Sequence, residues 1–179
     1  MVLVPLLMLR IEAGVAVSAL GGIAAVAVSA DFLRSRLSRF EKFIQRWFGG
    51  LMRREEEANM GSGVRINGAT WLFLGAFLSA LLFGVRDGAL GLAVFIVADA
   101  AGNLAGRRFG RRRWLGARAT LVGSAAFFVT ALAVGLLLPG TTLAACLVVA
   151  AASTVAEAAT PVNDNFVVPA VAAAAFYFF

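Results

Sequence analysis

Long apolar segments separated by short polar ones run through the whole chain. Each apolar segment has about the length that a helix needs to cross the hydrocarbon core of a bilayer, roughly 17–25 residues. Six of them are predicted to be membrane-spanning helices: 12–30, 67–85, 88–106, 119–138, 141–158 and 164–179. The pattern therefore predicts an all-α, polytopic membrane bundle that forms one integral membrane domain over residues 1–179.

The composition supports this class and limits the chemistry. Hydrophobic residues make up 61% of the 179 positions, whereas a soluble domain carries about 45–50% apolar residues. Such an excess is too large for one globular core. The single cysteine, Cys146, excludes an intrachain disulfide. Because histidine is absent, acid–base or metal chemistry must use carboxylates, carboxamides, hydroxyls or arginine.

The basic residues cluster in two of the predicted loops. Residues 31–66 contain eight of them and residues 107–118 contain six. The positive-inside rule places both loops in the cytoplasm, and the alternation of six spans puts the connection 159–165 on the same side. Nucleic acid is not an expected partner, because no basic and aromatic face lies outside the membrane segments.

The first basic loop has a helical period. Its apolar residues recur at steps of four and three from Leu33 to Leu51, with basic residues on the other side. This pattern predicts an amphipathic helix that lies on the inner leaflet, with Asp31 as a cap at its start. The helix is either a topology anchor or a gate for a substrate.

Three acidic residues are predicted at the cytoplasmic ends of membrane helices: Asp99, Glu157 and Asp164. An ionisable residue in a membrane segment indicates function by default. Asn163 and Asn165 flank Asp164, and carboxylates together with carboxamides suit Mg²⁺, which prefers oxygen ligands. We expect Asp99 and Asp164 to hold the ion, with Glu157 as a third or indirect ligand. Pairing with arginines, which would only stabilise the bundle, is the alternative.

Arginines and glycines follow Asp99 closely. Five arginines suit phosphate groups: Arg107, Arg108, Arg111, Arg112 and Arg113. Three glycines, Gly102, Gly106 and Gly110, let backbone amides approach phosphate oxygens. The motif Gly102-x-x-x-Gly106 is also typical of close helix packing. The run 111–113 is also typical of a topology anchor. Together these residues indicate a metal–nucleotide site at the edge of the membrane.

The same segments resemble a known enzyme family. "ADAAGNLAGRRFG" (98–110) is similar to the Asp-x6-Gly-x3-Gly segment of the dolichol kinase, phytol kinase and CTP-dependent diacylglycerol kinase family. "EAATPVNDNFVVP" (157–169) resembles the Glu, Asp-Asn and Pro segment near that family's C-terminus. The upstream loop and the helix after it, from "ADFLRSR" to "FLSALLF", resemble the diacylglycerol kinase and dolichol kinase branch. The resemblance covers most of 30–170 in the same order.

The resemblance implies a membrane kinase that uses CTP, or a related nucleotide, and Mg²⁺ to phosphorylate a lipid alcohol. It implies catalytic roles for Asp99 and Asp164. Arg54 and Glu56 match a feature of the family's first cytoplasmic loop less closely, and the resemblance implies a role for them in that loop. The implied nucleotide-binding residues are Asn103, Gly106, Arg107, Arg108, Gly110, Arg118, Thr120, Gly123, Ser124, Asn163 and Asn165.

One stretch departs from the family. Where the family has Lys-(Ser/Thr)-x-Glu-Gly, this chain has "ATLVGS", so Ala119 and Val122 stand at the Lys and Glu positions. Arg118 is a candidate to replace the lysine charge. A relative without activity is therefore one possible function class. A phosphatidate cytidylyltransferase-like enzyme and a small ion-coupled transporter are two more. The sequence leaves open which lipid is used and whether the chain forms a homo-oligomer.

Overall fold

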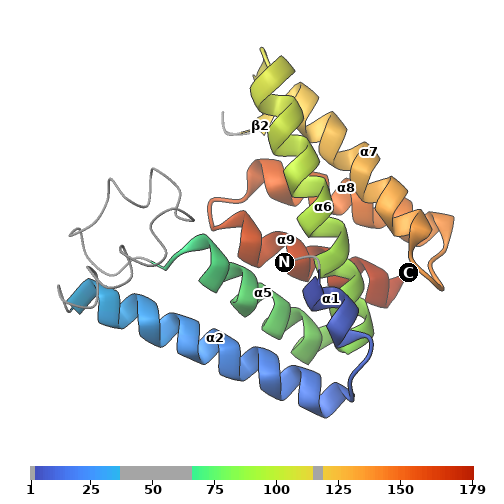
Figure 1. Ribbon diagram of the computed structural model, residues 1–179. Coiled ribbons are helices and arrows are strands. Elements are labelled where there is room, and N and C mark those ends of the chain that lie inside the picture. Colours follow the sequence, from blue (N-terminus) through green and yellow to red (C-terminus); the bar gives the residue numbers. More distant parts are fainter. Residues whose placement is uncertain (1–2, 37–65, 115–118) are drawn as a thin grey trace.

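The computed structural model describes residues 3–36, 66–114 and 119–179, and these residues are helical except for one short hairpin (Figure 1). In order they form α1 (Leu3–Met8), α2 (Ala13–Arg36), α5 (Gly68–Phe83), α6 (Val85–Phe109), β1 (Arg113–Trp114), β2 (Ala119–Thr120), α7 (Leu121–Leu137), α8 (Leu143–Ala159) and α9 (Asp164–Phe178).

The predicted all-α class is confirmed, and each of the six predicted segments contains or overlaps one helix, α2 or α5 to α9. Among the described helices, α2 and α6 are long and apolar enough to cross a membrane. The other four are apolar but shorter, with 16, 17, 17 and 15 residues. The crossing of all six helices therefore stays a prediction. The short helix α1 was not expected, because its six residues are too few to give a membrane-span signal.

Local polar residues set where the helices begin. Asn67, Thr120, Thr142 and Asn163 each accept a hydrogen bond through the side chain from a backbone N–H in the first turn of the following helix. Each thereby satisfies a donor that has no partner inside the helix. Between α5 and α6 a single residue, Gly84, makes the turn with φ of 85°, a conformation that glycine adopts without steric cost.

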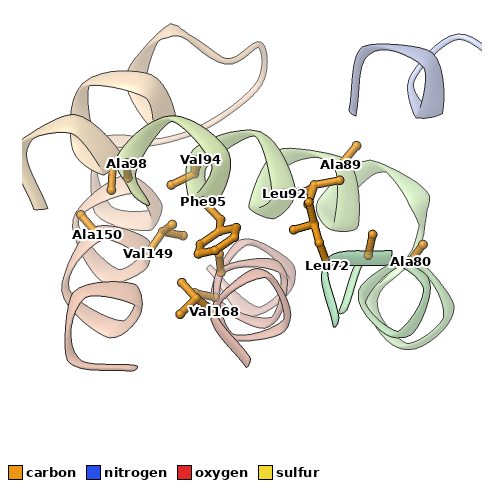
Figure 2. Close-up of a cluster of buried hydrophobic side chains, with 14 of the residues drawn as sticks. Leu72, Ala80, Ala89, Leu92, Val94, Phe95, Ala98, Val149, Ala150 and Val168 are labelled. Atoms are coloured by element: carbon orange, nitrogen blue, oxygen red, sulfur yellow. The ribbon is translucent and has the colours of Figure 1, made fainter. Parts of the chain in front are cut away.

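Helix α6 lies at the centre of the packing and contacts α7, α9 and α5 (Figure 1). Figure 2 shows Phe95 of α6 beside Val149 of α8 and Val168 of α9, and all three are fully buried. At Gly91 a Cβ atom would lie 2.6 Å from the backbone nitrogen of Ala173. This small residue therefore allows α6 and α9 to approach closely, as is common between membrane helices.

The end of α2 differs from the expectation. Asp31 does not cap a separate helix, because α2 continues without a break from Ala13 to Arg36. Its side chain is 4% exposed and accepts hydrogen bonds from the Asn67 N–H and Nδ2 at 2.9 Å each and from the Thr70 hydroxyl at 2.7 Å. Asp31 therefore joins the end of α2 to the start of α5. The rest of the predicted amphipathic helix lies outside the described residues.

Replacing Asp31 with alanine is expected to lower the free energy of unfolding by about 2–3 kcal/mol, because the buried Thr70 hydroxyl and the half-buried donors of Asn67 lose a charged acceptor. Denaturant titration of the detergent-solubilised protein measures this change. Ser35→Ala is the control, since its exposed hydroxyl donates only to the Phe32 carbonyl at 2.7 Å, and we expect a change within about 0.5 kcal/mol. Equal stability of Asp31→Ala and the parent would refute the joining role.

Candidate functional site

A polar cavity of about 320 Å³ opens where α6 ends and α7 begins. The cavity has walls from α6, α7, α8 and the β1–β2 hairpin. Its lining residues are Gly102, Asn103, Gly106, Arg107, Gly110, Arg113, Ala119, Thr120, Gly123, Ser124 and Glu157. All of these except Ala119 were candidate site residues from the sequence, and they come from three separate segments of the chain.

Glycines on α6 and α7 bring these two helices together beside the cavity. A Cβ atom on Gly106 would lie 3.0 Å from the Thr120 Oγ1, and one on Gly123 would lie 3.1 Å from the Gly102 carbonyl oxygen. Both values are tighter than ordinary van der Waals contact. The packing role of Gly102 and Gly106 is thus a feature of the structure. The approach of their backbone to phosphate oxygens stays a prediction.

The hairpin forms one side of the cavity. Its two strands are antiparallel, with Arg113 opposite Thr120 and Trp114 opposite Ala119. The Thr120 Oγ1 accepts a hydrogen bond from the Gly123 N–H at 3.0 Å, which caps α7. The Trp114 Nε1 donates to the Ser124 Oγ at 3.0 Å. The short strands therefore place Arg113 and Ala119 beside the first turn of α7.

Glu157 enters the cavity from α8. Among the described residues it is the one acidic side chain in the lining. Its Oε2 atom is buried and has no hydrogen-bond partner, while the Ser124 hydroxyl is near enough to interact with the carboxylate. The negative charges of Asp164 and Asp99 also act on Glu157. Asp99 of α6 and Asp164 of α9 therefore each lie within electrostatic range of Glu157 on α8.

The arrangement of the acids limits how they can hold a metal ion. No three acidic or cysteine side chains in the described parts of the chain are grouped closely enough to bind one ion by themselves. Mg²⁺ usually takes only one or two protein carboxylates and completes its six ligands with water and substrate phosphate. The donors fit that pattern of binding with a nucleotide, and they do not form a closed protein cage.

Asp99 and the tripeptide 163–165 lie outside the lining of the cavity. Asp99 is half-buried and accepts a hydrogen bond at 2.8 Å from the Nδ2 of Asn103, which does line it. At the start of α9, the Asn163 side chain accepts the Asn165 N–H at 3.1 Å. The Asp164 Oδ1 accepts the same N–H at 2.8 Å. Asn163 is therefore a helix cap. Asp164 does not line the cavity, but its negative charge acts on Glu157, which does.

Several further predicted residues are not brought to the cavity or cannot be placed. The Arg108 guanidinium is exposed and lies 5.6 Å from the centre of the Phe109 ring, and Arg108 is not in the cavity lining. Val122 is 40% exposed and also lies outside the lining. The predicted residues Arg54, Glu56 and Arg118 lie outside the described part of the chain.

The sequence left two roles open for two of the lining residues. Arg113 was a candidate for phosphate binding or for a topology anchor, and Gly102 was a candidate for close backbone approach to phosphate or for helix packing. Arg113 reaches the cavity because it lies in β1, which pairs with β2 directly before α7 begins. A two-residue strand gives no alternating pattern, so periodicity alone cannot detect this hairpin.

Comparison with known proteins finds a relative of unassigned activity. No protein-family model matches the chain, and no solved structure matches it. A Rickettsia prowazekii (strain Madrid E) protein with the name Uncharacterized protein RP860 is 28% identical over 115 residues. The match covers 64% of this chain and 54% of that protein, so the chain spans about half the length of its relative. The name of the relative states no activity, and functional inference therefore rests on the site of this chain.

Proposed function

We propose that the chain is a multi-pass membrane enzyme that transfers the γ-phosphate of CTP, or of a related nucleoside triphosphate, to the hydroxyl of a lipid alcohol such as diacylglycerol or a polyprenol. One observation carries the proposal: one polar cavity at the helix ends combines Glu157 with two arginines and four closely packed glycines. The resemblance of 98–110 and 157–169 to the lipid kinase family supports the same chemistry.

The surface of the helices supports a membrane location. Large apolar side chains are exposed along their outer faces, and Leu137 of α7 is 85% and Val26 of α2 is 70% exposed. In water such a surface would favour aggregation, whereas lipid covers it without cost. At about 1.5 Å per residue the shortest of the six helices measures roughly 23 Å, and a bilayer accommodates a short span by local thinning.

The orientation follows from the basic loops. With 31–66 and 107–118 in the cytoplasm, the C-terminal ends of α6 and α8 and the N-terminal ends of α7 and α9 face the cytoplasm. The cavity lies at three of these ends. A water-soluble nucleotide therefore reaches it from the cytoplasm, while a lipid reaches it from the inner leaflet.

Phosphoryl transfer requires positioning and charge neutralisation more than covalent chemistry. In this proposal Arg107 and Arg113 bind triphosphate oxygens, since a guanidinium donates to phosphate in a bidentate manner. Asp99 and Asp164 would hold the Mg²⁺ that neutralises the phosphates, and Glu157 would act on the ion indirectly. Because the chain has no histidine, a carboxylate accepts the proton of the lipid hydroxyl, and Asp99 is our candidate.

The position of Arg113 helps to distinguish an active enzyme from a family relative that has lost its activity. Ala119, which stands at the family's lysine position, is 6% exposed and lines the cavity. Arg113 lies in the paired strand and lines the same cavity. A cation is therefore present beside the position where the resemblance expects one, although Arg and Lys differ in geometry. This observation favours an active enzyme.

A transporter and a cytidylyltransferase account for the site less well than a kinase does. A small ion-coupled transporter is expected to carry its acids near mid-membrane on broken helices. Asp99 lies near the middle of α6, but α6 and α8 are unbroken, Glu157 is in the last turn of α8, and Asp164 begins α9. A phosphatidate cytidylyltransferase-like enzyme would use the same nucleotide but would transfer its cytidylyl group. The fate of each part of the nucleotide separates this enzyme from a kinase.

The purified protein in lipid vesicles is expected to move the γ-phosphate of CTP into the lipid fraction in the presence of Mg²⁺ and a suitable lipid alcohol. We expect unlabelled CTP to suppress transfer from γ-labelled CTP more strongly than unlabelled ATP does. The test is a radiolabel assay with a panel of diacylglycerols and polyprenols, and heat-inactivated protein is the control. Stronger suppression by ATP would overturn the nucleotide assignment, and no transfer to any lipid alcohol would overturn the kinase.

A further inference from the structure

A second hollow lies between α8 and α9 and differs in character from the polar cavity. It is a shallow groove that is widely open to the surroundings, with a volume of about 710 Å³. Helix α8 contributes to both hollows through different faces: Glu157 lines the polar cavity, while Val155 and Ala156 line the groove.

The groove is apolar along its length. Within the described parts of the chain no charged side chain lines it, and its lining residues are Ala151, Ala152, Val155, Ala156, Ala159, Thr160, Val167 and Val171. Four of these are alanines of α8, whose small side chains leave a depression beside α9. A surface of this kind is suited to hydrocarbon and offers little to bind a polar group.

One end of the groove is polar. Thr160 lies there, directly after α8 ends at Ala159. On α9, Val167 and Val171 follow Asp164 by three and seven residues, so all three share one face of the helix. The charge of Asp164 in turn acts on Glu157 in the polar cavity. The apolar groove therefore leads toward the carboxylates of the candidate site.

We propose that the α8–α9 groove binds one hydrocarbon chain of the lipid alcohol and directs its hydroxyl toward Asp164. This inference rests on the proposed kinase function and adds the binding site of the acceptor. An amphiphile matches the groove along its whole length, because the groove is apolar over two turns and polar at one end. A packed helix from a second copy would use the apolar part but has no need of the polar end.

Narrowing the groove tests the assignment. Ala152→Leu is expected to raise the KM for a long-chain lipid alcohol by about tenfold or more, the order of discrimination that a few methylenes give in an apolar pocket. The KM for the nucleotide and the rate with a short-chain lipid should stay near those of the parent. Ala133→Leu, on an exposed position of α7, is the matched control and should change neither value. Equal effects on long and short chains, or none, would overturn the proposal.

A second measurement does not depend on catalysis. A lipid alcohol with a photoreactive group in its chain is expected to cross-link the parent protein within 151–171, and Ala152→Leu should lose most of this product. If transfer is absent but this cross-link is found, the kinase function is refuted while the assignment of the groove as a lipid-binding site is supported. Cross-links spread over all apolar faces, including α2, would show surrounding lipid only. A disulfide between two copies of Val155→Cys would show that a second copy fills the groove, and either result refutes the assignment.

Discussion

Replacing Glu157 with glutamine is expected to lower the rate of phosphoryl transfer by about 100-fold or more, as when charge stabilisation is removed from a preorganised site. Within the described parts of the chain, Glu157 is the acidic side chain in the lining of the polar cavity, and its Oε2 is buried and has no hydrogen-bond partner. A buried polar atom without a partner is costly, so this oxygen is available to a bound ligand. Glutamine keeps the shape and removes the charge.

Asp87→Asn is the matched control for this variant. The Asp87 Oδ1 is also buried without a hydrogen-bond partner, but Asp87 lies in the first turn of α6, at the opposite end from the cavity. Transfer by Asp87→Asn should stay within about twofold of the parent. The comparison uses initial rates at saturating nucleotide on proteins that elute as a single species in detergent. A parent-like rate for Glu157→Gln, or equal losses in both variants, would remove Glu157 from the site.

Asp164→Asn and Asp99→Asn are each expected to reduce transfer by about 100-fold, and the double variant should lose little more than either alone. Two ligands of one ion act as a unit, so their effects are not additive. The measurement is the transfer rate against Mg²⁺ concentration for the parent, both single variants and the double variant. We expect the single variants to need more Mg²⁺ for half-maximal rate.

The cap of α9 provides the control for Asp164. Asn163 caps this helix, and a carboxamide at 164 still accepts the Asn165 N–H, so Asp164→Asn should fold normally. Asn163→Ser exchanges one good cap for another and should leave transfer and its Mg²⁺ dependence near the parent values. A parent-like rate and an unchanged Mg²⁺ requirement in Asp164→Asn would mean that Asp164 only begins a helix.

Hydrophobic pattern was enough to place the main helices. Apolar runs of about 20 residues are a strong signal, and Gly84 and the polar caps mark their ends. The pattern did not predict α1, whose six residues give no periodic signal, or the hairpin, whose strands have two residues each. It also placed a helix start at Asp31. The contacts of Asp31 with Asn67 and Thr70 span 36 and 39 residues, and no local pattern encodes contacts at that separation.

The candidate site was predictable where one helix end carries several polar residues. Asn103, Gly106, Arg107 and Gly110 share the C-terminal end of α6, and the structure places them in one cavity. Arg113 was one of five candidate phosphate-binding arginines, and its place in the cavity depends on the pairing of β1 with β2, which no local pattern encodes. In the tripeptide 163–165, the structure shows that Asn163 caps α9 through its side chain. The ligand roles of this tripeptide stay predictions.

The fate of doubly labelled CTP tests the central claim most directly. Protein in vesicles receives CTP with one label in the γ-phosphate and another in the cytosine ring, together with diacylglycerol or a polyprenol and Mg²⁺. Lipids are then extracted and both labels are counted. The kinase account predicts that the γ-phosphate label enters the lipid in equal amount to the CDP formed, while the cytosine label stays in the aqueous phase. Cytosine label in the lipid would show cytidylyl transfer, and neither label in the lipid would show that the chain is not this enzyme.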